Sequence, residues 1–101
     1  MKLSIVTTSY QSASTIVNFV ERMHTAAGEL KVSYELIIVD DGSTDDSKKN
    51  IRQLLPRYKN MRLIELSRNF GHHQAILLGL EHASGDYTFL IDSDLEEAPE
   101  L

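Results

Sequence analysis

Two aspartates separated by one small residue follow an apolar run near the carboxyl end of the 101-residue chain. The run covers residues 87–91, and the carboxylates are Asp92 and Asp94. Because residues two apart in an extended backbone point to the same face, both side chains can converge on one point just past a strand. Mg²⁺ binds through one or two carboxylates together with substrate phosphates, so this spacing suits a divalent cation. A solvated acidic turn is the alternative, and these residues alone leave both interpretations open.

The composition limits the size of the protein and the kind of partner it binds. One hundred and one residues with 42% hydrophobic content fit a single domain with one core. Ten Lys and Arg against fifteen Asp and Glu give a formal charge of −5, so we expect no nucleic-acid partner. The absence of cysteine excludes disulfides and thiolate metal sites. The sequence contains neither a signal-peptide pattern nor an apolar stretch that could span a bilayer, so we expect a cytoplasmic chain.

Four short apolar runs predict the strands of one sheet. The predicted strands cover residues 3–8, 34–39, 61–66 and 87–91. The second run is continuously apolar from Leu36 through Val39, as expected of a strand that is covered on both faces in a parallel sheet. The third run alternates less cleanly and is expected at or near an edge of the sheet.

Three helical patterns separate these strands. The predicted helices start at a cap provided by Ser12 or Ser14, at a cap provided by Thr44 or Asp45, and at His72, and they end near Gly28, Tyr58 and Ala83. Pro56 is expected to distort the last turn of the second helix. His24 and His82 fall within helices and are expected on the surface.

The alternation of strands and helices predicts the fold class. A βαβαβαβ order implies an α/β protein with a parallel sheet, right-handed crossovers and helices on both faces. Ligands of such sheets bind beyond the carboxyl ends of the strands, where the strand order reverses. With the order 3-2-1-4 this point lies between the first and fourth strands. The polar residues expected to meet there are Thr8, Ser9, Tyr10, Asp40, Asp41, Asp92 and Asp94.

Four motifs at the strand ends make the chain resemble a known family. They are Thr8-Ser9-Tyr10, Val39-Asp40-Asp41-Gly42-Ser43-Thr44-Asp45, Ser67-Arg68-Asn69-Phe70-Gly71 and Asp92-Ser93-Asp94. In order and spacing they resemble the inverting family 2 glycosyltransferases of the GT-A fold. Residues 67–71 and 94–100 are more similar to the subgroup of dolichol- and polyprenyl-phosphate sugar transferases. The resemblance covers residues 1–101, which correspond to the Rossmann-like, nucleotide-sugar-binding half of the GT-A fold.

The resemblance also implies roles for residues on the nucleoside side of the donor. Thr8 and Tyr10 would border the nucleobase. Asp41 would accept a hydrogen bond from the uracil imide, while Asp40 would bind the donor or instead hold the loop. Arg68 would lie near the nucleotide. The donor implied is a nucleotide sugar, with UDP preferred over GDP.

For the diphosphate and the reaction, the resemblance implies metal-assisted transfer. Asp92 would hold the ribose, and Asp92 and Asp94 would hold Mg²⁺ or Mn²⁺ bridging the diphosphate. The acceptor would be a lipid phosphate or a saccharide. No catalytic residue is expected within this chain, because the family's catalytic base and acceptor-binding elements lie in the half that would follow Leu101. The chain alone is therefore expected to be incomplete and inactive, to self-associate through exposed apolar surface, and to lie at the cytoplasmic face of a membrane if the natural protein is longer.

Two other functions stay open at the level of sequence. A phospho-accepting receiver domain also has βα repeats with acidic strand ends, but it would need an acidic pair after the first strand, where this chain has Thr7-Thr8-Ser9. A non-catalytic module that binds nucleotide sugars is the other alternative. His72 and His73 lie where a loop becomes a helix and could contact a phosphate. A pair of exposed histidines is more often a polar helix start, so both are left out of the predicted site.

Overall fold

The computed structural model describes residues 1–91 and contains one parallel four-stranded sheet. Its strands are β1 (Lys2–Ser9), β2 (Ser33–Asp40), β3 (Met61–Glu65) and β4 (Tyr87–Leu90). They lie in the order β3-β2-β1-β4, and each neighbouring pair is parallel. The predicted α/β fold, the strand order and the edge position of the third strand are thereby confirmed.

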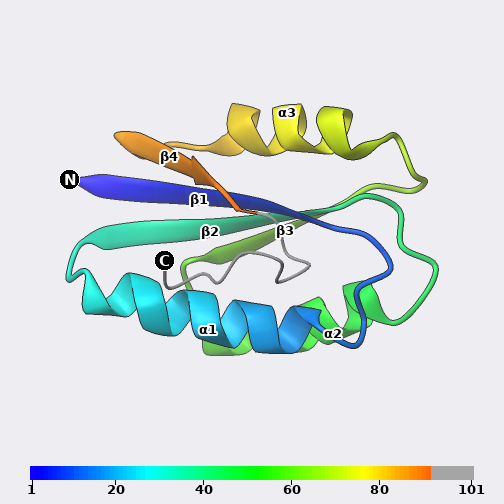
Figure 1. Ribbon diagram of the computed structural model, residues 1–101, viewed down its shortest axis with the longest axis horizontal. Coiled ribbons are helices and arrows are strands. Elements are labelled where there is room, and N and C mark those ends of the chain that lie inside the picture. The colour runs from blue at the N-terminus through cyan, green and yellow to red at the C-terminus, as the bar shows by residue number, and fades with distance from the viewer. Residues whose placement is uncertain (92–101) are drawn as a thin grey trace.

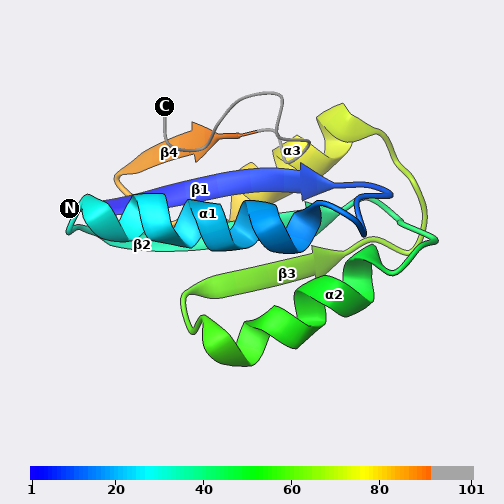
Figure 2. The same cartoon turned by 60° about the horizontal axis from the view of Figure 1, so that its bottom comes forward.

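Helices cover both faces of this sheet (Figure 1). They are α1 (Ile16–Glu29), α2 (Ser47–Leu54), the short 3₁₀ helix η1 (Leu55–Arg57) and α3 (His72–His82). Figure 2 shows α1 and α2 in front of the sheet and α3 behind it. The 3₁₀ turn contains Pro56, which confirms the predicted distortion at the end of the second helix.

The core has two layers because β1 and β2 are buried on both faces. Between the sheet and the α1–α2 layer lie Ile5, Ile16, Phe19, Val20, Met23, Ala27, Leu36, Ile38, Ile51, Leu54 and Met61. The smaller layer under α3 contains Val6, Ile37, Val39 and Ala75. At Gly79 of α3 an added Cβ would lie 2.5 Å from Val6 Cγ1, so glycine is what lets the helix approach β1.

The first helix begins and ends differently from the prediction. Its N-cap is Thr15 rather than Ser12 or Ser14, because the Ser12 hydroxyl bonds to Ser9 Oγ (2.7 Å). The helix also continues through Gly28 to its end at Glu29, and Lys31 adopts the positive φ of 56°. Contacts with other loops, which a local pattern does not contain, decide both ends.

The N-cap of the second helix lies one residue after the later of its two predicted caps. Its N-cap position is Asp46. Asp45 nevertheless stabilises this helix start, since its Oδ1 accepts hydrogen bonds from Ser47 N (3.0 Å) and Ser47 Oγ (2.6 Å). One of the two predicted caps therefore acts from outside the helix.

His24 is buried, which contradicts the prediction that it lies on the surface, while His82 is exposed as expected. The His24 ring stacks on Tyr58 with a centroid separation of 3.7 Å, and its Nδ1 lies 2.6 Å from the Tyr34 hydroxyl. Burial lowers the pKa of the His24 imidazole to about 4. The two tyrosines come from β2 and the segment after η1, so the environment of this histidine is tertiary.

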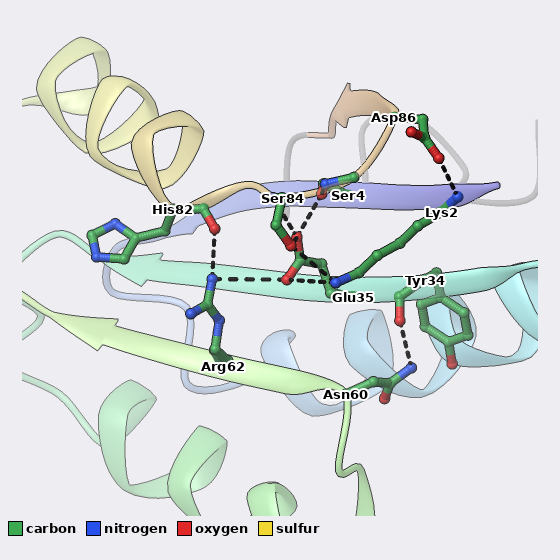
Figure 3. A network of polar contacts seen from close by, with 10 residues as sticks. Lys2, Ser4, Tyr34, Glu35, Asn60, Arg62, His82, Ser84 and Asp86 are labelled. Carbon is green, nitrogen blue, oxygen red and sulfur yellow. Dashed lines mark hydrogen bonds and ion pairs between the residues drawn. The ribbon is translucent and has the colours of Figure 1, made fainter.

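A buried carboxylate organises the opposite, amino-terminal edge of the sheet (Figure 3). Glu35 Oε2 accepts hydrogen bonds from Ser4 Oγ (2.6 Å), Ser84 N (2.8 Å) and Ser84 Oγ (3.0 Å). Lys2 and Arg62 form ion pairs with Glu35 Oε1 at 3.8 and 3.7 Å. Burial acts to raise the pKa of the Glu35 carboxyl, but the hydrogen bonds from Ser4 and Ser84 outweigh it and hold the pKa below its usual value.

This network fixes the turn between α3 and β4. Arg62 also donates to the carbonyl of His82 at the end of α3 (2.6 Å), and Asp86 N donates to the carbonyl of Lys2 (2.8 Å). The turn therefore enters β4 in the register that pairs Tyr87 with Leu3. Through that register, the network positions the carboxyl end of β4.

Candidate functional site

The loops that follow β1, β2 and β3 gather at one edge of the sheet, on the right of Figure 1. Because all four strands are parallel, their carboxyl ends meet there. Of the predicted site residues, Thr8, Tyr10, Asp40, Asp41 and Arg68 lie on this edge or in its loops. Asp92 and Asp94 lie outside the described residues.

Asp40 closes the turn that follows β2. Its side chain is fully buried, and its two oxygens accept hydrogen bonds from Ser43 N and Ser43 Oγ, both at 2.8 Å. The turn needs Gly42, whose φ is +78°. These contacts hold the loop after β2 in place, which is one of the two roles predicted for Asp40. Direct binding of the donor by Asp40 stays a prediction.

Asp41 ties the loop after β2 to the loop after β3. Its Oδ1 accepts from Phe70 N (2.8 Å), and its Oδ2 accepts from Gly71 N (3.1 Å) and Asn69 Nδ2 (3.2 Å). Two successive backbone N–H groups on one carboxylate fix the path of the chain into α3. The side chain therefore positions the start of that helix.

The same two loops are in backbone contact beside Asp41. A Cβ added to Gly42 would lie 2.2 Å from the carbonyl carbon of Arg68 and 2.4 Å from Asn69 N. The Arg68 guanidinium lies over the Phe70 ring, 4.5 Å from its centroid. This cation–π contact keeps an exposed cation at the rim of the carboxyl edge.

The loop after β1 is held by the loop after β2. Gln11 has a positive φ of 51°, and its Oε1 accepts from Thr44 N (2.6 Å) and Asp45 N (3.3 Å). Its backbone N–H donates to Ser43 Oγ (2.9 Å). Tyr10, the residue before it, is 51% exposed. The hydrogen bonds of Gln11 thus hold the loop so that the aromatic ring of Tyr10 faces solvent at this edge. Gln11 is a positioning residue that the sequence motifs did not indicate.

His72 joins the site although the sequence prediction left it out. Thr8 is buried, and its Oγ1 lies 3.0 Å from His72 Nδ1. This contact links the end of β1 to the first residue of α3 across 64 positions of sequence. The signal available in the sequence was the position of His72 at a helix start directly after a strand-end loop.

A cavity of about 220 Å³ lies where β1 and β4 end. Its lining residues are Val6, Thr7, Thr8, His72, Ile76, Leu90 and Ile91. The strand order reverses between β1 and β4, so this cavity occupies the place where parallel sheets bind ligands. Its walls are mixed, since four lining side chains are apolar and three, those of Thr7, Thr8 and His72, are polar.

Neither a metal centre nor a membrane span is found in residues 1–91. Over this range, no three or more His, Asp or Glu side chains gather in a way that could hold a metal ion. In the same residues no helix has the length and apolar character needed to cross a membrane. The metal ligands predicted at Asp92 and Asp94 stay a prediction.

Solved structures share this fold. A Pyrobaculum calidifontis mannosyltransferase, determined with GDP-Man and Mn²⁺, matches 91% of this chain and 27% of its own with a TM-score of 0.78 and 20% identity. Staphylococcus aureus TarS, determined with UDP, matches 93% of this chain and 28% of its own with a TM-score of 0.75 and 23% identity. At these identities the likeness shows the fold, which is the nucleotide-binding half of the GT-A fold.

Sequence relatives and a family model extend the comparison. A Mycobacterium tuberculosis protein whose name assigns it to the glycosyltransferases is 50% identical over 100% of this chain and 30% of its own length. An undecaprenyl-phosphate 4-deoxy-4-formamido-L-arabinose transferase of Proteus mirabilis is 37% identical over 98% of this chain and 31% of its own length. The chain thus spans about a third of the length of these relatives. The family model described as glycosyl transferase family 2 matches residues 4–101, so this chain belongs to glycosyl transferase family 2.

Proposed function

We propose that this chain is the donor-binding part of an enzyme that moves a sugar from a nucleoside diphosphate, with UDP preferred, to a polyprenyl-phosphate or saccharide acceptor. The observation that carries the proposal is the convergence of Thr8, His72 and the loop held by Asp41 beside the cavity between β1 and β4. Family membership supports this function over a phospho-accepting receiver domain.

The relatives support the two substrate classes. The name of the Proteus mirabilis relative gives undecaprenyl phosphate as the lipid on which that protein acts. TarS was determined with UDP and the Pyrobaculum calidifontis enzyme with GDP-Man, so both nucleotides occur among structures of this fold. We choose UDP because it is the more common donor nucleotide of the family that the chain resembles.

The roles proposed for the described residues are those that the resemblance to the family implies. Thr8 and the exposed ring of Tyr10 border the nucleobase, and Arg68 lies near the nucleotide. Asp41 accepts the imide N–H of the base. A carboxylate offers about four acceptor positions, and the loop after β3 fills three of those on Asp41. Asp40 supports the site by holding the turn after β2.

Asp92 and Asp94 would hold Mg²⁺ or Mn²⁺, with Asp92 also reaching the ribose. The Mn²⁺ in the Pyrobaculum calidifontis structure supports the choice of metal. When bound, such an ion supplies positive charge that stabilises the departing nucleoside diphosphate. The contribution of this chain is to bind the donor and to orient it at the carboxyl edge.

Isothermal titration of the 101-residue chain with UDP and GDP, with and without Mn²⁺, tests this function. We expect UDP to bind more tightly in the presence of Mn²⁺. Asp92→Asn and Asp94→Asn should each remove most of the Mn²⁺-dependent part of the affinity, whereas Asp46→Asn, at an exposed position, serves as the matched control. Equal affinity with and without Mn²⁺ in every variant would contradict the metal site, and no binding of either nucleotide would contradict the function.

A further inference from the structure

The first residue of α3 contacts one predicted base-binding residue and directly follows the segment that is held by another. Thr8 Oγ1 lies 3.0 Å from Nδ1 of His72. Asp41 accepts the N–H groups of Phe70 and Gly71, the two residues that precede His72 in the chain. We propose that His72 is a further donor-binding residue, which contacts the nucleobase and helps to select it. This proposal rests on the proposed function and adds a residue to the same site.

The surroundings of His72 suit a planar ligand. It lines the cavity between the ends of β1 and β4, whose other walls include Val6, Ile76 and Leu90. Apolar walls combined with a few fixed polar groups are the usual form of a small-molecule site. The imidazole is held in place before any ligand arrives, because Thr8 bonds to the ring and Asp41 fixes the preceding backbone.

The two nitrogens of the imidazole have different environments. Nδ1 is engaged by Thr8, and among residues 1–91 Nε2 has no hydrogen-bond partner. When the Thr8 hydroxyl donates to Nδ1, the neutral ring carries its proton on Nε2, which is then a donor. We assign this tautomer to the nucleotide-bound state.

A donor at His72 complements an acceptor at Asp41. The pairing edge of uracil presents an imide N–H between two carbonyl oxygens. Asp41 would accept the N–H, and Nε2–H of His72 would donate to a neighbouring carbonyl. Cytosine has a ring acceptor in place of the imide N–H and an amine in place of one carbonyl, so it leaves unpaired groups in this arrangement. A buried unpaired polar group costs enough to discriminate between two bases.

Binding of uridine and cytidine to the 101-residue chain tests the proposal, with UDP titrated in parallel. The unaltered chain should prefer uridine. His72→Phe keeps a planar ring without its nitrogens and should lose about tenfold in uridine affinity, with a smaller loss for cytidine. His72→Gln places an amide near the position of Nε2 and should retain the preference. His72→Asn reproduces only the position of Nδ1 and should behave like His72→Phe. His73→Phe, at the neighbouring exposed position, is the matched control.

Three results would overturn the inference while the proposed function stands. The first is unchanged uridine binding in His72→Phe, and the second is an equal loss for uridine and cytidine. The third is retention by His72→Asn but not by His72→Gln, which would mean that His72 acts only by holding Thr8. If the unaltered chain binds neither uridine nor UDP, the proposed function is overturned together with the inference. The melting temperature of each variant is measured beside that of the unaltered chain, and His72 is exposed at a helix start, so we expect every variant to stay folded.

Discussion

Adjacent carboxylates at the end of β2 have different partners. Asp40 is directed to its own turn through Ser43, and Asp41 is directed to the next loop through Phe70 and Gly71. The sequence predicted that both lie at the carboxyl edge, because an acidic pair follows an apolar strand. It could not predict how the two divide their contacts, because Phe70 and Gly71 lie about thirty positions away.

For His24, too, the sequence could not predict the environment of the side chain, because its partners are distant in sequence. The spacing of apolar residues along α1 predicts its inward face, and His24 follows Met23 on that face. The prediction nevertheless placed His24 on the surface, because histidine is in general only partly buried. Tyr34 and Tyr58, from two other elements, supply the hydroxyl and the stacked ring that make burial possible.

The buried imidazole should make the stability of the fold depend on pH. The pKa of His24 is lowered from 6.5 to about 4, so between these values the unfolded chain takes up a proton that the folded chain does not. The free energy of unfolding should therefore be unaffected above the unfolded pKa and should fall as the pH drops from 6.5 towards 4. The shift corresponds to a loss of at most about 3 kcal/mol.

Urea unfolding of the unaltered chain and of His24→Phe at several pH values measures this effect. Phenylalanine keeps the stacking on Tyr58 and cannot be protonated, so the variant should lose stability less steeply below pH 6.5. The Asp and Glu carboxylates titrate in both proteins, so their contribution cancels when the two free energies of unfolding are subtracted. His82→Phe, at an exposed position, should keep the pH dependence of the unaltered chain. Parallel curves for the unaltered chain and His24→Phe would show that this histidine does not carry the effect.

At the scale of elements, the strands were more predictable than the helix ends. The ends of every predicted strand agree with the structure to within one residue, since short apolar runs between polar loops leave few alternatives. Helix starts depend on contacts that are distant in sequence. Ser12 N donates to Ser47 Oγ at the start of α2 (2.7 Å), and the Ser12 hydroxyl bonds to Ser9, so the predicted cap is engaged elsewhere and the helix begins later.

The Glu35 network should control the turn between α3 and β4. Glu35→Gln keeps the size of the side chain, but it removes the charge. Its amide NH2 must face either the Ser4 and Ser84 donors at the Oε2 position or the cations of Lys2 and Arg62 at the Oε1 position. We expect a loss of about 1–3 kcal/mol in the free energy of unfolding. Hydrogen exchange should also become faster at Ser84 and the residues of β4, because the turn sets the register of that strand.

Glu65→Gln is the matched control for this prediction. Glu65 pairs with Arg52 on the surface, where an ion pair contributes about 0–1 kcal/mol. Its replacement should leave the exchange rates of β4 unchanged. If Glu35→Gln is no more destabilising than Glu65→Gln, the buried carboxylate does not organise the turn.

At the scale of the whole molecule, β4 is an edge strand of the sheet that residues 1–91 form. In the described residues it pairs only with β1, and Tyr87, Phe89 and Leu90 are each more than half exposed. Exposed apolar strand edges favour association, which supports the expected self-association of this chain. The sequence predicted the fold of this region correctly from its apolar runs, but a single sequence does not show which surfaces further residues or a partner would cover.

The last prediction is that the 101-residue chain binds a nucleotide sugar without transferring the sugar. The chain spans only about a third of the length of its relatives, 30% in the Mycobacterium tuberculosis protein, and its described polar contacts at the carboxyl edge belong to the donor side of the proposed site. Acceleration of transfer requires both reactants to be held in line, so a donor site alone should bind without turnover. The assay follows release of UDP and labelling of polyprenyl phosphate or saccharide acceptors by UDP-sugars in the presence of Mn²⁺. Titration of UDP in the same sample controls for folding, because a chain that binds UDP and still gives no product lacks the acceptor machinery. Sustained turnover by the 101 residues would contradict the prediction and would place that machinery within this sequence.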